Sequence, residues 1–155
     1  MRKIKTGVIG CGKVGDYHAQ CYSQLENSDF TAVCNHNIGR AKTFGEKYGV
    51  PAFDSVTQMV RETGVEAVSI CTPHPAHMAM AVEAAELGLH VAIEKPLAST
   101  LADCDAIIQA VEKSGVTGSM VCQRRFYKPV QRVHQAIVDG KLGKPILGSL
   151  NMLGW

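Results

Sequence analysis

Lys95 is the charged residue of this chain that is best placed for chemistry. It stands in Glu94-Lys95-Pro96, directly after an apolar run at residues 90–93 that is typical of a short buried strand. A lysine ammonium group stabilises negative charge that develops on a substrate oxygen, such as an alkoxide from which hydride departs. A lysine at the end of a strand also commonly extends its charged end into solvent. The tripeptide alone leaves both interpretations open.

Gly10, Gly12 and Gly15 form a second candidate site, a G-x-G-x-x-G turn that follows an apolar run at residues 3–9. In a dinucleotide-binding turn, the first glycine permits the tight bend and the second lets the backbone approach a pyrophosphate. The third lets the helix pack closely on the strand. The next helix, which begins around Lys13 and Val14, offers free N–H groups to the phosphates. An ordinary glycine-rich turn or a methyltransferase-type site is the alternative, and the strand–turn–helix context favours the dinucleotide.

Asn35 occupies the position, about 20 residues beyond the glycine turn, where a dinucleotide site usually carries Asp or Glu. Its amide still hydrogen-bonds a ribose hydroxyl, but it lacks the carboxylate that would repel a 2′-phosphate. Arg40 follows closely enough to meet such a phosphate. The sequence therefore predicts NAD as the cofactor by a slight preference, and NADP stays open.

Apolar runs alternate with helical patterns along most of the chain. The expected strands are residues 4–9, 31–34, 67–71, 90–93 and 117–122, and the expected helices are residues 14–25, 40–48, 57–63, 76–87 and 100–113. This alternation implies right-handed crossovers and a parallel sheet with helices on both faces. We therefore predict an α/β fold, a doubly wound parallel sheet of the Rossmann type, at residues 1–122. Ligands bind such sheets at the carboxyl ends of the strands, where the glycine turn and Lys95 are both expected.

The pattern changes after residue 122, and residues 123–155 are predicted to begin a second, α+β domain. A helix is expected at residues 130–139, a turn-rich connector at 140–145 and a strand at 146–153. An apolar strand without a partner sheet favours self-association. We therefore expect a homo-oligomer.

Composition limits the classes of function. The chain has 155 residues, of which 46% are apolar and 19% charged, and its net charge of +2 is too small to indicate a nucleic acid or an anionic membrane as partner. It contains no apolar run long enough to span a membrane, and its first residues lack the pattern of a signal peptide. Its six cysteines form no CxxC pair, which favours reduced thiols in a cytoplasmic protein and no metal site.

The motifs of this chain, taken in order, resemble those of the Gfo/Idh/MocA oxidoreductase family, whose best-known members oxidise or reduce sugars, inositols and related polyols. The resemblance rests on the glycine turn with His18, Cys71-Thr72-Pro73 with His77, Gly88-Leu89-His90-Val91 leading into Glu94-Lys95-Pro96, Gln123-Arg124-Arg125-Phe126, and Gly140-Lys141-Leu142-Gly143. The chain resembles sugar-nucleotide and inositol dehydrogenases in particular. Where the family often has Asn after the Thr-Pro pair, this chain has His74.

The resemblance assigns roles to individual residues. Lys95 is expected to contact the reacting hydroxyl and to orient it toward the nicotinamide, with Glu94 beside it. The residues expected to line the cofactor groove are Cys71, Thr72, Pro73 and His77, and Gln123 is expected near the nicotinamide end. These residues join the glycine turn, Asn35 and Arg40 as the predicted cofactor site.

The resemblance also implies a substrate domain that supplies a histidine as general acid/base. That histidine would lie beyond Trp155, so we expect a truncated chain that binds cofactor and carries one catalytic residue. The leading hypothesis is an NAD(P)-dependent dehydrogenase acting on a sugar, sugar-nucleotide or polyol hydroxyl. The alternative is a dinucleotide-binding module, or a partner subunit, without catalysis of its own.

Overall fold

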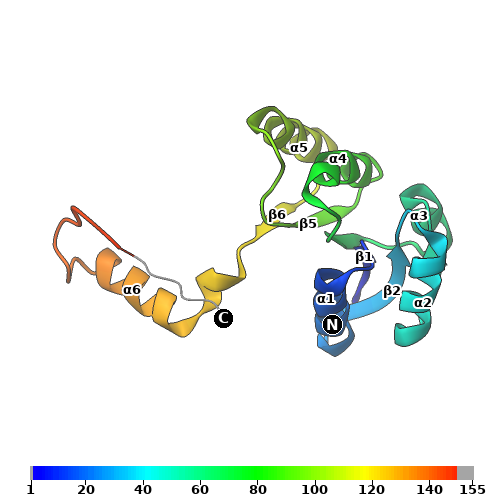
Figure 1. Ribbon diagram of the computed structural model, residues 1–155, viewed down its shortest axis with the longest axis horizontal. Coiled ribbons are helices and arrows are strands. Elements are labelled where there is room, and N and C mark those ends of the chain that lie inside the picture. The colour runs from blue at the N-terminus through cyan, green and yellow to red at the C-terminus, as the bar shows by residue number, and fades with distance from the viewer. Residues whose placement is uncertain (1, 150–155) are drawn as a thin grey trace. The chain divides into compact units, whose positions relative to one another are not determined.

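The computed structural model describes residues 2–149, which divide into two compact units between Val121 and Cys122. This division lies one residue before the predicted boundary. Each unit is described by itself, and both are drawn in Figure 1. That the second unit begins a substrate domain stays a prediction.

The first unit is built on a parallel sheet. Within residues 2–149 the sheet has six strands in the order β3-β2-β1-β4-β5-β6, and all adjacent strands run parallel. They are β1 (Ile4–Ile9), β2 (Ser28–Cys34), β3 (Ala52–Phe53), β4 (Ala67–Ile70), β5 (His90–Glu94) and β6 (Gly118–Val121). The predicted doubly wound Rossmann fold is confirmed. The direction of winding reverses between β1 and β4, which creates the switch point where such sheets bind ligands.

The helices begin and end at residues suited to those places. They are α1 (Lys13–Gln24), α2 (Ile38–Tyr48), α3 (Val56–Thr63), α4 (His77–Glu86) and α5 (Leu101–Ser114). Side chains of Asn37, Ser55 and Thr100 accept backbone hydrogen bonds at the N-termini of α2, α3 and α5. Each of these three helices ends at a glycine in the left-handed conformation.

The helices cover both faces of the sheet because neighbouring strand residues point to opposite sides. Val8 packs in a cluster with side chains of α1 and α2, whereas Ile9 packs with side chains of α3, α4 and α5. In Figure 1, α4 and α5 lie side by side over the β5 end of the sheet. The near-continuous apolar strands of the sequence are explained by this burial on two faces.

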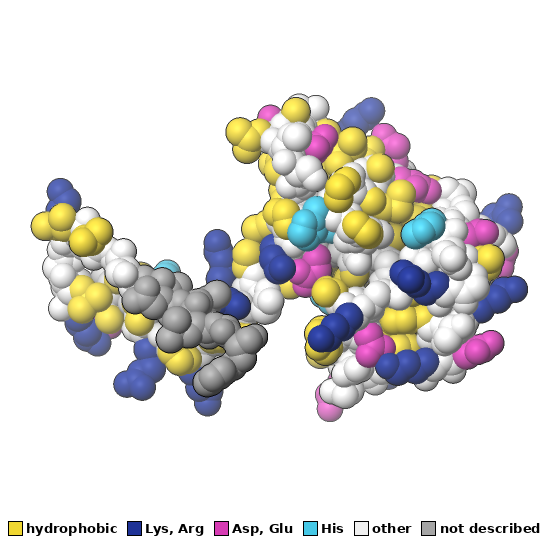
Figure 2. All heavy atoms as spheres, viewed as in Figure 1, with side chains coloured by type: hydrophobic (Ala, Val, Ile, Leu, Met, Phe, Trp, Pro, Cys, Tyr) yellow, Lys and Arg dark blue, Asp and Glu magenta, His cyan; other side chains and the backbone are white. Residues whose placement is uncertain are grey.

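The second unit contains the 3₁₀ turn η2 (Gln123–Phe126) and helix α6 (Lys128–Val138). Its apolar residues Val130, Val133 and Ile137 recur at helical spacing and are all exposed. Figure 2 shows hydrophobic side chains gathered over this unit. The strand predicted at residues 146–153 is absent from residues 146–149, and residues 150–153 lie outside the described part. Within residues 2–149, no helix is both long and apolar enough to cross a membrane.

Candidate cofactor and catalytic site

The glycine turn between β1 and α1 leaves space for a ligand at one of its three glycines. Gly10 has φ +107°, and a Cβ there would lie 2.6 Å from the carbonyl carbon of Cys71. A Cβ on Gly15 would lie 2.0 Å from the carbonyl oxygen of Gly10. A Cβ on Gly12 would meet no atom of the described residues within 4 Å. Gly10 and Gly15 are therefore required by packing, whereas Gly12 faces open space.

The N-terminus of α1 presents unused backbone donors beside this turn. Gly12 is the N-cap, and no side chain of residues 2–149 caps the helix. Lys13 and Val14 form the exposed first positions of the helix. The uncapped N–H groups and the positive end of the helix dipole suit a phosphate.

A cavity of about 500 Å³ opens at the carboxyl ends of the strands on the α4 side of the sheet. Its walls include three predicted cofactor residues, Asn35, Thr72 and Pro73. They also include the carboxylates of Asp54 and Glu83, which sequence reasoning missed. Asp54 follows β3, and a two-residue strand is too short to give the apolar run that would have marked its end.

Arg40 lies near the glycine turn but in a different hollow, of about 370 Å³, which it lines together with Gly12 and Lys13. The hollow also contains Lys47, whose ammonium lies 2.6 Å from the Asp16 carboxylate. Cationic groups therefore gather on the α2 side of the turn, whereas carboxylates line the cavity on the α4 side.

Thr72 offers a polar atom that the protein does not use. Its Oγ1 is buried and has no hydrogen-bond partner among residues 2–149. A buried hydroxyl without a partner is costly, so a ligand that fills the adjoining cavity and bonds to it would remove that cost. The open Gly12, the uncapped α1 terminus and this hydroxyl together fit a dinucleotide.

The Lys95 turn follows β5 at the same edge of the sheet. Lys95 is exposed, its peptide bond to Pro96 is cis, and its backbone N–H donates to Glu94 Oε2 at 3.1 Å. The other carboxylate oxygen, Glu94 Oε1, lies 3.1 Å from His18 Nε2. The Glu94 carboxylate is therefore held by the protein, while the Lys95 ammonium has no partner among residues 2–149.

His77 lies beneath the expected groove and has no exposed surface. Its Nδ1 is 2.9 Å from the carbonyl oxygen of Pro96, and its Nε2 is 3.0 Å from that of Thr72. Both ring nitrogens therefore face backbone atoms of the protein. The ring joins the turn after β4 to the turn after β5, and the expected place of His77 along the cofactor groove stays a prediction.

Cys11 and Cys71, the two cysteines near the turn, both have raised thiol pKa values. Burial raises the pKa of the Cys11 thiol to about 11, although the charge of Arg40 opposes the shift. Burial, reinforced by the Glu94 carboxylate, raises the pKa of Cys71 to about 12. Both thiols are protonated at neutral pH, so Cys71 contributes packing and backbone to the predicted site.

Sequence reasoning did not find the polar chain that leads from α1 to Glu94. His18 Nδ1 lies 2.9 Å from the hydroxyl of Ser69, a β4 residue that is 1% exposed. The Tyr22 hydroxyl lies 2.7 Å from the same Ser69 oxygen. His18 and Tyr22 are one helical turn apart, which was the available signal for a shared partner.

Gln123 belongs to the second unit, in η2. Its expected approach to the nicotinamide end stays a prediction.

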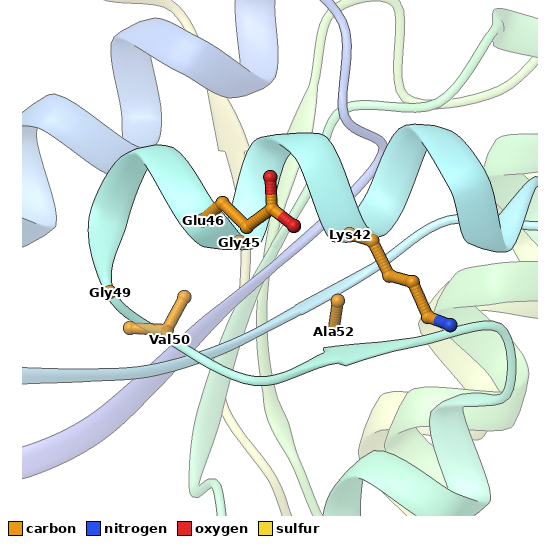
Figure 3. A pocket seen from close by; sticks show the side chains of 6 residues that line it. All are labelled: Lys42, Gly45, Glu46, Gly49, Val50 and Ala52. Carbon is orange, nitrogen blue, oxygen red and sulfur yellow. The ribbon is translucent and has the colours of Figure 1, made fainter.

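Another hollow, of about 350 Å³, lies between α2 and the segment that leads into β3 (Figure 3). Lys42 and Glu46, the charged residues that line it, do not point toward one another in that view. The hollow contains no predicted site residue and no converging polar groups.

Known oxidoreductases are similar to this chain over most of its length. A myo-inositol 2-dehydrogenase of Thermotoga maritima is 29% identical over 143 residues, which cover 92% of this chain and 43% of that protein. A UDP-N-acetylglucosamine 3-dehydrogenase of Acidithiobacillus ferrooxidans is 34% identical over 136 residues, covering 88% of this chain and 42% of that protein. The chain thus spans less than half the length of these relatives.

A solved structure of a dehydrogenase is also similar to this chain. The WlbA dehydrogenase from Bordetella pertussis, crystallised in complex with NADH and UDP-GlcNAcA, matches with a TM-score of 0.87 and 29% identity. The match covers 92% of this chain and 44% of that one. The model of the oxidoreductase family with an NAD-binding Rossmann fold matches residues 4–122. The chain therefore belongs to the Gfo/Idh/MocA family, as its N-terminal, NAD-binding part.

Proposed function

We propose that this chain supplies the cofactor site and the catalytic lysine of an NAD(P)-dependent oxidoreductase. The reaction would transfer hydride between the nicotinamide and a hydroxyl of a sugar, sugar nucleotide or polyol. The similar proteins are named as dehydrogenases of inositol and of a UDP-sugar, which supports that substrate class. Because the chain spans less than half of them, the activity of the whole protein is part of the proposal.

One observation carries this proposal: the glycine turn and Lys95 lie at the same edge of one sheet. The turn follows β1 and Lys95 follows β5, and only β4 separates these parallel strands. A dinucleotide with its pyrophosphate at the turn would run along this edge, which is where doubly wound sheets bind ligands.

Lys95, rather than Glu94, suits direct contact with substrate. The Glu94 carboxylate is 13% exposed and already bonded at both oxygens, to His18 and to the Lys95 backbone. The ammonium group of Lys95 would donate a hydrogen bond to the reacting hydroxyl and stabilise negative charge that develops on its oxygen. The bound nicotinamide would supply the hydride acceptor or donor.

For the cofactor we propose NAD, with NADP as the alternative. The Asp54 and Glu83 carboxylates line the cavity that also contains Asn35, and carboxylates there disfavour an additional phosphate. Arg40 and Lys13 on the other side of the turn support NADP. Isothermal titration with both dinucleotides decides between them, and a smaller dissociation constant for NADP would overturn the choice.

The remaining proposals concern assembly and location. The exposed apolar side of α6 supports a homo-oligomer, and a monomer in sedimentation equilibrium would contradict it. The six cysteines are all free, which fits a reducing, cytoplasmic compartment.

Hydride transfer by the protein that contains this chain tests the proposed role of Lys95. We expect Lys95→Met to lower kcat by about 100-fold or more, because a charge aimed at the transition state is lost, and to leave the dissociation constant of the cofactor unchanged. The matched control is Lys113→Met, which replaces an exposed lysine in the last turn of α5 and should change neither quantity. Tight cofactor binding with no turnover dependent on Lys95 would favour the alternative, a dinucleotide-binding module without catalysis.

A further inference from the structure

The residues on either side of Lys95 are each held by a histidine from another part of the chain. The side chain of Glu94, before it, lies against His18 of α1, and the carbonyl of Pro96, after it, lies against His77 of α4. The Lys95 side chain itself is exposed. A flexible lysine reaches a defined point only if the backbone that carries it is fixed.

The His18 side of this arrangement connects Lys95 to the cofactor helix. His18 stands in the second turn of α1, whose first turn adjoins the glycine turn. Its Nδ1 is fixed by the buried Ser69 hydroxyl at 2.9 Å, which leaves Nε2 directed at Glu94 Oε1 at 3.1 Å. The second oxygen of Glu94 then accepts the Lys95 N–H. The helix that would meet the phosphates is thus bonded, through a single carboxylate, to the backbone of Lys95.

The His77 side connects Lys95 to the cavity. The ring is fully buried, and its two nitrogens lie 2.9 Å and 3.0 Å from the carbonyl oxygens of Pro96 and Thr72. A neutral imidazole carries one N–H, so the tautomer determines which of the two carbonyl oxygens accepts a hydrogen bond. In either tautomer the ring fills the space between the turn after β4 and the turn after β5. Removing it would separate the Thr72 turn from the Lys95 turn.

We infer that His18 and His77 are positioning residues that hold the Lys95 turn from its two sides and couple it to the cofactor site. Neither histidine needs to touch substrate or cofactor, because each acts through a neighbour of Lys95. The inference rests on the proposed function of Lys95 only where it concerns catalysis. The coupling of the turn itself is a statement about this chain alone.

Kinetics of the whole protein test the catalytic part. A misplacement of about 1 Å at a reacting group costs on the order of 100-fold in rate, so we expect His18→Ala and His77→Ala each to lower kcat by roughly 10- to 100-fold. The KM for the dinucleotide should change less than about threefold, because the glycine turn is untouched. His18→Gln and His77→Gln retain an amide donor and should recover part of kcat.

A variant of the core outside the two turns separates positioning from general destabilisation. Met59→Ala removes a fully buried side chain of α3 and should lower the melting temperature while kcat stays within about twofold, since Met59 belongs to neither turn and bonds to neither. If His18→Ala and His77→Ala lowered kcat no more than Met59→Ala does at the same loss of melting temperature, the inference would be wrong.

Amide hydrogen exchange tests the coupling without any activity. In the 155-residue chain, His18→Ala should speed exchange of the Lys95 amide by about tenfold or more, because Glu94 loses the bond that orients its carboxylate. His77→Ala should speed exchange at Leu97, the residue after Pro96. In Met59→Ala the exchange rates of the Lys95 and Leu97 amides should stay in the same ratio to the exchange rates of the β4 and β5 amides. Unchanged exchange in the histidine variants would overturn the inference.

The two tests also separate this inference from the proposed function. If Lys95→Met turned over normally, the proposed role of Lys95 would fail, and the exchange rates alone would then decide whether the histidines hold the turn. If Lys95→Met were inactive while both histidine variants kept full kcat, the inference would fail and the role of Lys95 would stand.

Discussion

The glycine turn and the Lys95 turn lie at the same edge of the sheet but are built in different ways. The glycine turn is formed by backbone atoms within six consecutive residues, and the absence of side chains at Gly10 and Gly15 gives it its shape. The Lys95 turn is formed by side chains that come from elsewhere, including His18, which is 76 residues away from Glu94 in the sequence. Changes in the first should therefore act on folding and cofactor binding, whereas changes around the second should act on turnover.

Gly15→Ala should have the largest effect, because the new Cβ would lie 2.0 Å from the backbone oxygen of Gly10. The gain in helix propensity, about 1 kcal/mol, is outweighed by an overpacking cost of about 1–3 kcal/mol or more. We expect a lower melting temperature by circular dichroism and loss of cofactor binding. A variant with unchanged stability would show that the helix shifts freely and that the turn is less constrained than its geometry indicates.

Gly12→Ala should separate binding from folding within the same turn. Its φ of −105° suits any residue, and its Cβ would meet no described atom within 4 Å. Stability should therefore change by less than about 0.5 kcal/mol, while the dissociation constant of the dinucleotide should rise by about tenfold or more, because the methyl group occupies space that the pyrophosphate needs. Titration calorimetry measures the second effect, and equal affinities would remove Gly12 from the predicted cofactor site.

Thr72→Val should weaken cofactor binding without lowering the stability of the fold. The buried Oγ1 has no partner among the described residues, so replacing it with a methyl group should leave the melting temperature unchanged or raise it slightly. Loss of a hydrogen bond to the cofactor, about 1 kcal/mol, would weaken binding roughly fivefold. Thr100→Val is the control, because its hydroxyl caps α5 and its loss should lower stability without affecting the cofactor. A Thr72→Val protein that binds normally would show that the hydroxyl has no ligand.

Asp16→Asn should have the smallest effect, on stability alone. Hydrogen bonds from Lys47, first, and Tyr48 hold the pKa of Asp16 below its ordinary value of 3.8. Because the folded-state pKa is lowered, the carboxylate contributes its stabilisation at every pH above 3.8 and loses it as pH falls through the lower folded value. The difference in melting temperature between wild type and variant should thus be small and constant near neutral pH and should shrink below pH 3.8. A difference that grew on acidification would contradict this sign.

Most of the sheet could be predicted because each strand is buried on both faces and therefore apolar throughout. β1 was predicted at its exact bounds, whereas β3 was missed because two residues, Ala52 and Phe53, give no periodic signal. The sequence also contains local signals for the ends of α2 and α5, because each helix begins after a polar N-cap and ends before a glycine.

Only those features of the candidate site that depend on residues close together in the sequence could be predicted. The positions of Gly10, Gly12 and Lys95 just beyond the carboxyl ends of β1 and β5 could be predicted, because turns and strand ends depend on neighbouring residues. His77 was expected to line the groove, but the structure buries it between two carbonyls. A histidine that follows a turn gives the same signal whether its ring faces a ligand or the interior, since its direction depends on how α4 packs.

The sequence by itself determined that a glycine turn and a lysine would stand at the carboxyl edge of a parallel sheet, because turn chemistry and strand burial act over a few residues. Only the tertiary structure decided what holds that lysine in place. The bonds from His18 to Glu94 and from His77 to Pro96 join residues that are distant in the sequence, and such pairs come together only after α1 and α4 have packed on the sheet.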